Sequence, residues 1–218
     1  MDLRRQEFKR AIKWASLLFL GFLAVTQQVI TNGPLITLDA KVFNADRPYL
    51  TPLEKLILLR IDNLGLRGVT ATILFITAFF IARRFKSWRP LNLSILAVLA
   101  LNLVVGLAKL GIGRTKPRLN VDLVYAGGLS YPSGHASNAI LTWGVLAYIL
   151  YRYSHPDAWH PVAMGVAAGI FSIGVCVVSA FRNTHWISDL LGGLFIGGAL
   201  LVMVIAVDRF VPSQKQIR

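Results

Sequence analysis

The sequence contains little cysteine and little charge. Its 218 residues include one cysteine, Cys176, and only 15% of them are charged, whereas a soluble domain carries about 25% charged residues. A single cysteine excludes an intramolecular disulfide. The scarcity of charge, together with a hydrophobic share of 55%, argues against a soluble domain. It predicts an integral membrane protein in which a single domain, residues 1–218, uses the whole chain.

Acidic residues are especially scarce. The chain has 10 Asp and Glu residues against 23 Lys and Arg residues, a net charge of +13. In a soluble protein this excess would suggest binding to nucleic acid, but in so apolar a chain we expect no such partner. Two explanations remain open. The basic residues set the orientation in the membrane, or some of them bind an anionic substrate.

Long apolar runs, by contrast, are abundant. A membrane-crossing helix needs about 20 mostly apolar residues, so the sequence predicts an all-α bundle of about six transmembrane helices. They cover roughly residues 14–30, 69–81, 91–108, 136–151, 161–181 and 187–207. Basic residues before the first run are typical of a signal peptide. The run is long, however, and LAVTQQ is a poor cleavage site, so we expect a retained anchor.

Lys and Arg cluster on one side of these predicted helices. They lie before residue 14, in 83–89 and in the tail 209–218. The side rich in basic residues is cytoplasmic, which predicts a multi-pass protein of the cytoplasmic membrane with both termini inside. The long segment 31–67 then lies outside. Within it TPLEKLILLRIDNLG has the apolar spacing of a helix in the membrane interface, although binding of a partner is an alternative role.

Four cations crowd the outer end of the third predicted helix. They are Lys109, Arg114, Lys116 and Arg118. The orientation rule disfavours basic residues on this side, whereas a bound polyanion would explain them. Contact with lipid headgroups, or a solvated loop, is the alternative.

The fourth predicted helix opens with Pro132-Ser133-Gly134-His135. Proline suits the first turn of a helix, and the free amides there, such as that of Gly134, bind phosphate with help from the helix dipole. Gly134 also lets an anion approach the backbone closely. His135 would then lie within reach of that anion. A plain turn followed by a helix cap is the alternative.

Arg182, His185 and Asp189 have the spacing i, i+3, i+7. On one helix they share a face. Asp189 would accept a proton from one ring nitrogen of His185, which fixes the tautomer and leaves the other nitrogen as a base or nucleophile. Arg182 would lie one turn away, where a phosphate would bind. An intramembrane ion pair that only supports packing is the alternative, but ionisable residues at this depth are functional by default.

Taken together, these three stretches resemble the type 2 phosphatidic acid phosphatase (PAP2) superfamily, whose pattern is K-x6-R-P, then P-S-G-H, then S-R-x5-H-x3-D. Lys109 and Pro117 match the first motif, residues 132–135 match the second, and His185 and Asp189 match the end of the third. The resemblance covers roughly residues 60–205. Two departures stand out, because Lys116 replaces the first arginine, and Val178 and Ser179 replace the serine and arginine of the third motif. We expect Arg182 to compensate for Ser179.

The resemblance implies a bacterial membrane lipid phosphatase that uses neither a metal nor a cofactor. It implies that His185 attacks phosphorus to form a phosphohistidine, that Asp189 orients His185, and that His135 protonates the leaving oxygen. The phosphate ligands would be Lys109, Lys116, Ser133, Gly134 and Arg182. A site on the extracytoplasmic side suggests undecaprenyl diphosphate as the substrate, with phosphatidylglycerophosphate, phosphatidate and diacylglycerol pyrophosphate as rivals. A lipid phosphotransferase and a non-catalytic protein that binds or transports anionic lipid are the alternative functions.

Overall fold

A computed structural model describes residues 2–114, 129–153 and 160–211, which contain helices and no β-strand. The predicted all-α class is therefore confirmed for these parts of the chain. The helices are α1 (Asp2–Ile30), α2 (Pro34–Phe43), α3 (Pro52–Asn63), α4 (Arg67–Arg84), α5 (Arg89–Ile112), α6 (Gly134–Asn138), the π-helical turn η1 (Ala139–Trp143), α7 (Gly144–Tyr153), α8 (Pro161–Phe181) and α9 (Ile187–Phe210).

Four helices of the described part are long and apolar enough to cross a membrane, namely α1, α5, α8 and α9. A fifth is added if α3 and α4, which meet at an angle of 58°, count as one broken span. The predicted helix 136–151 corresponds to α6, η1 and α7, which follow one another without a break from Gly134 to Tyr153. The predicted second helix, 69–81, lies inside α4. The count of six remains a prediction.

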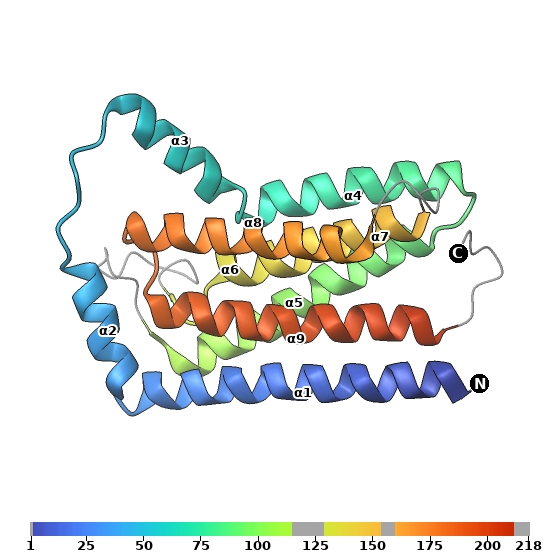
Figure 1. Cartoon of the computed structure of the whole chain (residues 1–218), viewed down its shortest axis with the longest axis horizontal. Coiled ribbons are helices and arrows are strands. Elements are labelled where there is room, and N and C mark those ends of the chain that lie inside the picture. Colours follow the sequence, from blue (N-terminus) through green and yellow to red (C-terminus); the bar gives the residue numbers. More distant parts are fainter. Residues whose placement is uncertain (1, 115–128, 154–159, 212–218) are drawn as a thin grey trace.

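The long helices lie side by side along one axis (Figure 1). The start of α1, the α4–α5 turn and the end of α9 share one end of the bundle, which we call the terminal end. The short helices α2 and α3, the start of α6 and the α8–α9 turn lie at the opposite end, which we call the α2–α3 end. Residues that are far apart in the sequence therefore meet at the α2–α3 end.

Apolar side chains face both inward and outward. A buried cluster joins α1, α4, α5, α7 and α9 and includes Phe22, Leu74, Leu101, Leu141, Val145, Ile149 and Ile196. Outside, Leu96, Leu99, Leu103 and Leu107 of α5 are 59–65% exposed and recur every three or four residues, so they form a stripe along the helix. An exposed apolar stripe of this kind suits contact with lipid chains.

The bend between α3 and α4 depends on Gly65. A Cβ atom at this position would lie 2.7 Å from the Val175 Cγ1 atom and 3.2 Å from the His135 Cβ atom, so only glycine allows the chain to pass so close to α6 and α8. α3 itself begins with a capping box between Thr51 and Glu54. The predicted helix is thus confirmed as a helix, and its location in the membrane interface stays a prediction.

A buried ion-pair cluster joins three helices at the terminal end. The Asp208 carboxylate of α9 accepts from Arg89 Nε at 2.6 Å and lies 3.0 Å from Arg152 Nη1. It also accepts a hydrogen bond of 2.6 Å from the Tyr148 hydroxyl. These contacts hold α5, α7 and α9 together.

Candidate active site

The P-S-G-H stretch forms a tight turn that leads into α6. Ser133 is the N-cap, and its hydroxyl oxygen accepts a hydrogen bond of 3.3 Å from the Ala136 amide. The helix therefore begins at Gly134. The prediction that Pro132 occupies the first helical turn is wrong, because Pro132 precedes the cap and follows a cis peptide bond after Tyr131. Ser133 is fully buried.

Three glycines of α9 let this turn and α6 lie directly against the α9 backbone. A Cβ atom on Gly193 would lie 2.5 Å from the Ser133 carbonyl oxygen, and one on Gly197 would lie 2.8 Å from the Ser137 carbonyl oxygen. Gly192 similarly makes room for the Tyr131 ring. A backbone hydrogen bond of 2.9 Å from the Ser133 amide to the Asp189 carbonyl oxygen completes the contact. The turn and the start of α9 thus form one unit.

The expectation that Arg182, His185 and Asp189 share one helix face is wrong. α8 ends at Phe181 and Arg182 is its C-cap. Asn183 follows with a φ of 54°, a left-handed conformation that asparagine tolerates and that ends a helix. A new helix then begins at Ile187, where the Asp189 carboxylate accepts a 3.1 Å hydrogen bond from the Trp186 amide. The spacing thus spans the end of one helix and the start of the next.

The turn nevertheless brings His185 close to Asp189 and to His135. His185 Nδ1 lies 3.6 Å from Asp189 Oδ2, slightly beyond a hydrogen bond, and makes no hydrogen bond within the described residues. The ring centroids of His135 and His185 are 5.4 Å apart. His185 is 5% exposed and Asp189 is fully buried. With Nδ1 turned to the carboxylate, Nε2 is the nitrogen left for chemistry.

Arg114 stabilises the buried Asp189 carboxylate. Its guanidinium lies 3.1 Å from Asp189 Oδ1 and 2.7 Å from Asp39 Oδ2, and it stacks over the Trp186 ring at 5.2 Å. Asp39 also accepts a 2.9 Å hydrogen bond from the Ser188 amide, which ties α2 to α9. Because two carboxylates share Arg114, this cation positions Asp189.

Arg182 and Ser179 meet on one carboxylate. Asp62 of α3 accepts from the Ser179 hydroxyl on Oδ1 and from Arg182 Nη1 on Oδ2. Ser179 is fully buried. The residue at the arginine position of the third motif is therefore linked to Arg182 through Asp62.

Of the predicted phosphate ligands, Lys109 lies in the last turn of α5 and donates a 2.6 Å hydrogen bond to the Leu129 carbonyl oxygen, just ahead of the P-S-G-H turn. Lys116 lies outside the described residues. The structure thus brings Ser133, Gly134, His135, His185 and Asp189 together and pairs Arg182 with Asp62. No three His, Cys, Asp or Glu side chains of the described segments are placed to hold a metal ion, and a metal-free reaction remains a prediction.

Sequence reasoning missed Asp39 and Asp62. Both are almost fully buried carboxylates. Asp39 is the one acid of the mostly apolar helix α2, which was a usable signal. Asp62 shares α3 with Glu54 and Arg60 and offered no such signal. What the sequence did not reveal was which distant cation each one binds.

Comparison with known proteins identifies the family of this chain. Residues 90–211 match the model of the PAP2 superfamily. Phosphatidylglycerophosphatase B of Bacillus subtilis (strain 168) is 26% identical over 199 residues, which cover 91% of this chain and 97% of the relative. A crystal structure described as the first transmembrane PAP2 type phosphatidylglycerolphosphate phosphatase from Bacillus subtilis has the same fold, with a TM-score of 0.81, 24% identity, and coverage of 92% of this chain and 98% of that one. The family match alone spans more than half of the sequence, so the chain belongs to the PAP2 superfamily of lipid phosphatases.

Proposed function

We propose that the protein hydrolyses a lipid phosphate or diphosphate through a phosphohistidine formed on His185. One observation carries the proposal. Asp189 contacts His185 through its carboxylate and the P-S-G-H turn through its carbonyl oxygen, which sets the rings of His135 and His185 5.4 Å apart. A nucleophile, its orienting carboxylate and a second imidazole are the groups that a two-step phosphoryl transfer needs.

In the first step, Nε2 of His185 attacks phosphorus and the bond to the leaving oxygen breaks. His135 gives a proton to that oxygen. Asp189 balances the positive charge that develops on the His185 ring, and Arg114 keeps Asp189 in place. In the second step, His135 takes a proton from water, the water oxygen attacks phosphorus, and His185 is released with inorganic phosphate.

Phosphoryl transfer is accelerated mainly by fixed positive charges and amides around the phosphoryl oxygens. We assign this role to Lys109, Lys116, the Ser133 hydroxyl, the Gly134 amide and Arg182. The contact between Arg182 and Asp62 supports its assignment, because it holds the guanidinium beside the position at which the motif has arginine.

Two substrates stand out. The name of the Bacillus subtilis relative favours phosphatidylglycerophosphate, and a site on the outer surface favours undecaprenyl diphosphate. Phosphatidate and diacylglycerol pyrophosphate are further candidates of the same chemistry.

We further propose that the whole chain is one membrane domain with six crossings. Five of the crossings are α1, α4, α5, α8 and α9. The sixth is the continuous run from Gly134 to Tyr153, which is long enough because about 20 helical residues span the apolar layer. An even number of crossings agrees with the position of the start of α1 and the end of α9 at one end (Figure 1). The basic residues near that end favour the cytoplasm. We therefore propose that the histidines face the outside and that α3 lies in the outer interface.

Phosphate release from the detergent-purified protein, measured without added metal over a panel of lipid phosphates, tests the proposal. Wild type should release phosphate and trap labelled phosphate on protein, whereas His185→Ala should do neither. His160→Ala, which alters an exposed histidine before α8, is the matched control. Turnover by His185→Ala within about tenfold of wild type would refute the assignment of His185 as the nucleophile.

The same assay distinguishes the alternative functions. Transfer of label to an added alcohol in place of water would indicate a phosphotransferase, and lipid binding without turnover would indicate a carrier.

A further inference from the structure

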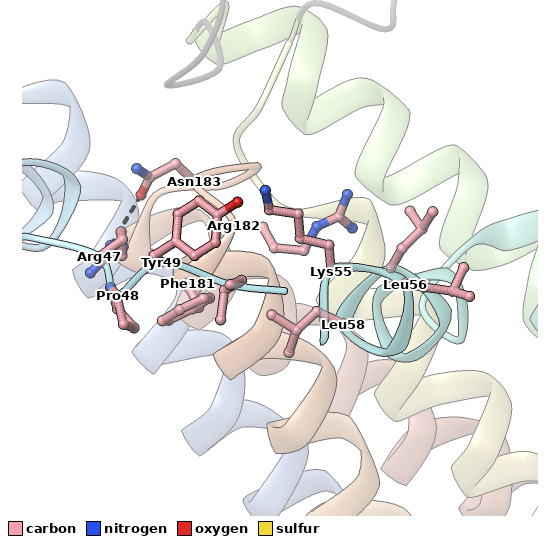
Figure 2. Close-up of a pocket in the computed structure, with 11 residues that line it drawn as sticks. Arg47, Pro48, Tyr49, Lys55, Leu56, Leu58, Phe181, Arg182 and Asn183 are labelled. Atoms are coloured by element: carbon pink, nitrogen blue, oxygen red, sulfur yellow. Dashed lines mark hydrogen bonds between the residues drawn. The ribbon is translucent and has the colours of Figure 1, made fainter. Parts of the chain in front are cut away.

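A pocket of about 690 Å³ shares Arg182 with the candidate active site. It lies between α3, the loop that precedes α3 and the end of α8 (Figure 2). Arg182 and Asn183 line it and stand just before His185 in the chain. A molecule in this pocket would therefore be adjacent to the turn that carries the nucleophile.

The pocket carries positive charge that the described residues do not neutralise. Lys55 makes no ion pair among them, and its ammonium lies 5.3 Å from the centroid of the Tyr49 ring. Arg47 donates at 2.6 Å to the Val42 carbonyl oxygen and at 3.2 Å to Asn183 Oδ1, which are both uncharged acceptors.

Two further observations support this excess of positive charge. Arg47 Nε is buried without a hydrogen-bond partner in the described residues. Glu54, the acid next to Lys55 in the chain, is engaged with Thr51 at the start of α3. The pocket thus offers two uncompensated cations beside Arg182.

The opposite edge of the pocket is apolar. In Figure 2 the Lys55 ammonium, the Tyr49 hydroxyl and the Arg182 guanidinium are directed to one edge, whereas Phe181 and Leu58 lie at the other. Leu56 on the same helix is 46% exposed. Cations on one side and apolar side chains on the other complement an anionic amphiphile.

We propose that this pocket binds a second phosphate group of the lipid whose terminal phosphate is attacked by His185. Arg47 and Lys55 then make the enzyme select lipids with two phosphate groups over lipids with one. The inference rests on the proposed function. The family match begins at residue 90, so both cations lie outside it, which suits a role in substrate choice rather than in the common chemistry.

A comparison of two substrates with identical acyl chains, measured in mixed detergent micelles, tests the inference. The quantity measured is the ratio of kcat/KM for phosphatidylglycerophosphate to kcat/KM for phosphatidate. Lys55→Ala should lower this ratio about tenfold, the effect of losing one charge-assisted phosphate contact, chiefly through a higher KM for the lipid with two phosphates. Arg60→Ala removes an exposed cation of the same helix that does not line the pocket. It should leave the ratio at the wild-type value.

An unchanged ratio in Lys55→Ala would overturn the inference. The alternative occupant is a separate anionic lipid. In that case, added phosphatidylglycerol should raise phosphatidate turnover in wild type but not in Lys55→Ala. This result would contradict a subsite for the substrate. If wild type hydrolyses no lipid of the full panel, the proposed function fails. The phosphate affinity of the pocket is then tested by equilibrium binding of phosphatidylglycerol, with diacylglycerol as the uncharged control. A loss of the preference for phosphatidylglycerol in Lys55→Ala supports a phosphate site in this pocket, and an equal preference in wild type and Lys55→Ala contradicts it.

Discussion

The two ends of the bundle each hold a buried aspartate of α9 beside arginine, yet only the aspartate at the α2–α3 end also contacts a histidine. At the terminal end, Arg89, Arg152 and Tyr148 occupy both oxygens of Asp208. At the α2–α3 end, Arg114 contacts Oδ1 of Asp189, and Oδ2 accepts from the Trp186 amide and also lies 3.6 Å from His185 Nδ1. Both carboxylates are thus fully engaged, and the ends differ because only Asp189 also contacts an imidazole, the arrangement in which a carboxylate orients a base or nucleophile.

Among variants that separate the two aspartates, Asp189→Asn should have the largest effect on activity. The amide cannot balance the positive charge on His185 during attack, and it leaves Arg114 with one carboxylate partner. We expect turnover to fall by roughly three to four orders of magnitude, as is typical when the carboxylate behind a catalytic histidine is neutralised. Phosphate release at saturating lipid measures it. A loss smaller than about tenfold would mean that Asp189 is structural, like Asp208.

The next largest effect should come from Arg182→Ala. Losing a charged phosphate contact of about 1.5–3 kcal/mol corresponds to roughly a ten- to hundredfold loss of kcat/KM, and Arg182→Lys should recover only part because lysine lacks the planar fork. The double variant Ser179→Arg, Arg182→Ala returns a cation to Asp62 from its Oδ1 side and should exceed the single variant. Near wild-type activity of Arg182→Ala would exclude this role.

Asp208→Asn should separate stability from activity. Removing one partner of a buried ion pair costs about 3–5 kcal/mol, and Arg89 and Arg152 would both lose their carboxylate. We expect a lower Tm in detergent with kcat within about twofold of wild type, because Asp208 lies at the end opposite to the histidines (Figure 1). A kcat loss comparable to that of Asp189→Asn would show that the two ends are coupled.

The smallest effect on activity is expected from two cysteines that test orientation. Ser87→Cys lies in the α4–α5 turn and Ala45→Cys in the loop between α2 and α3, each in a Cys176→Ala background. A membrane-impermeant thiol reagent added to sealed cells should label the cysteine at 45 and not the one at 87. The reverse pattern would place the histidines on the cytoplasmic side.

The sequence predicted the long helices and the central residues of the site because both are local patterns. Apolar runs located α5, α8 and α9, and short motifs located His135, His185 and Asp189. Asp39 and Asp62 could not be paired with Arg114 and Arg182 in advance, because these contacts join segments at least 75 residues apart. The break after Phe181 was missed for a different reason, since a spacing of three and four residues is equally compatible with one helix and with a helix end followed by a new cap.

The glycine face of α9 has a consequence for how the protein matures in the membrane. His185, the nucleophile that we propose, lies in the turn that leads into α9, and Asp189 lies in the first turn of α9. Gly193 lies against the Ser133 carbonyl oxygen and Gly197 against that of Ser137. Among the described helices α9 is the last to leave the ribosome. A nascent chain that has inserted only as far as α8 therefore holds His135 without His185. On the proposed mechanism, hydrolysis begins only after α9 has been inserted, and a chain released before α9 is catalytically silent.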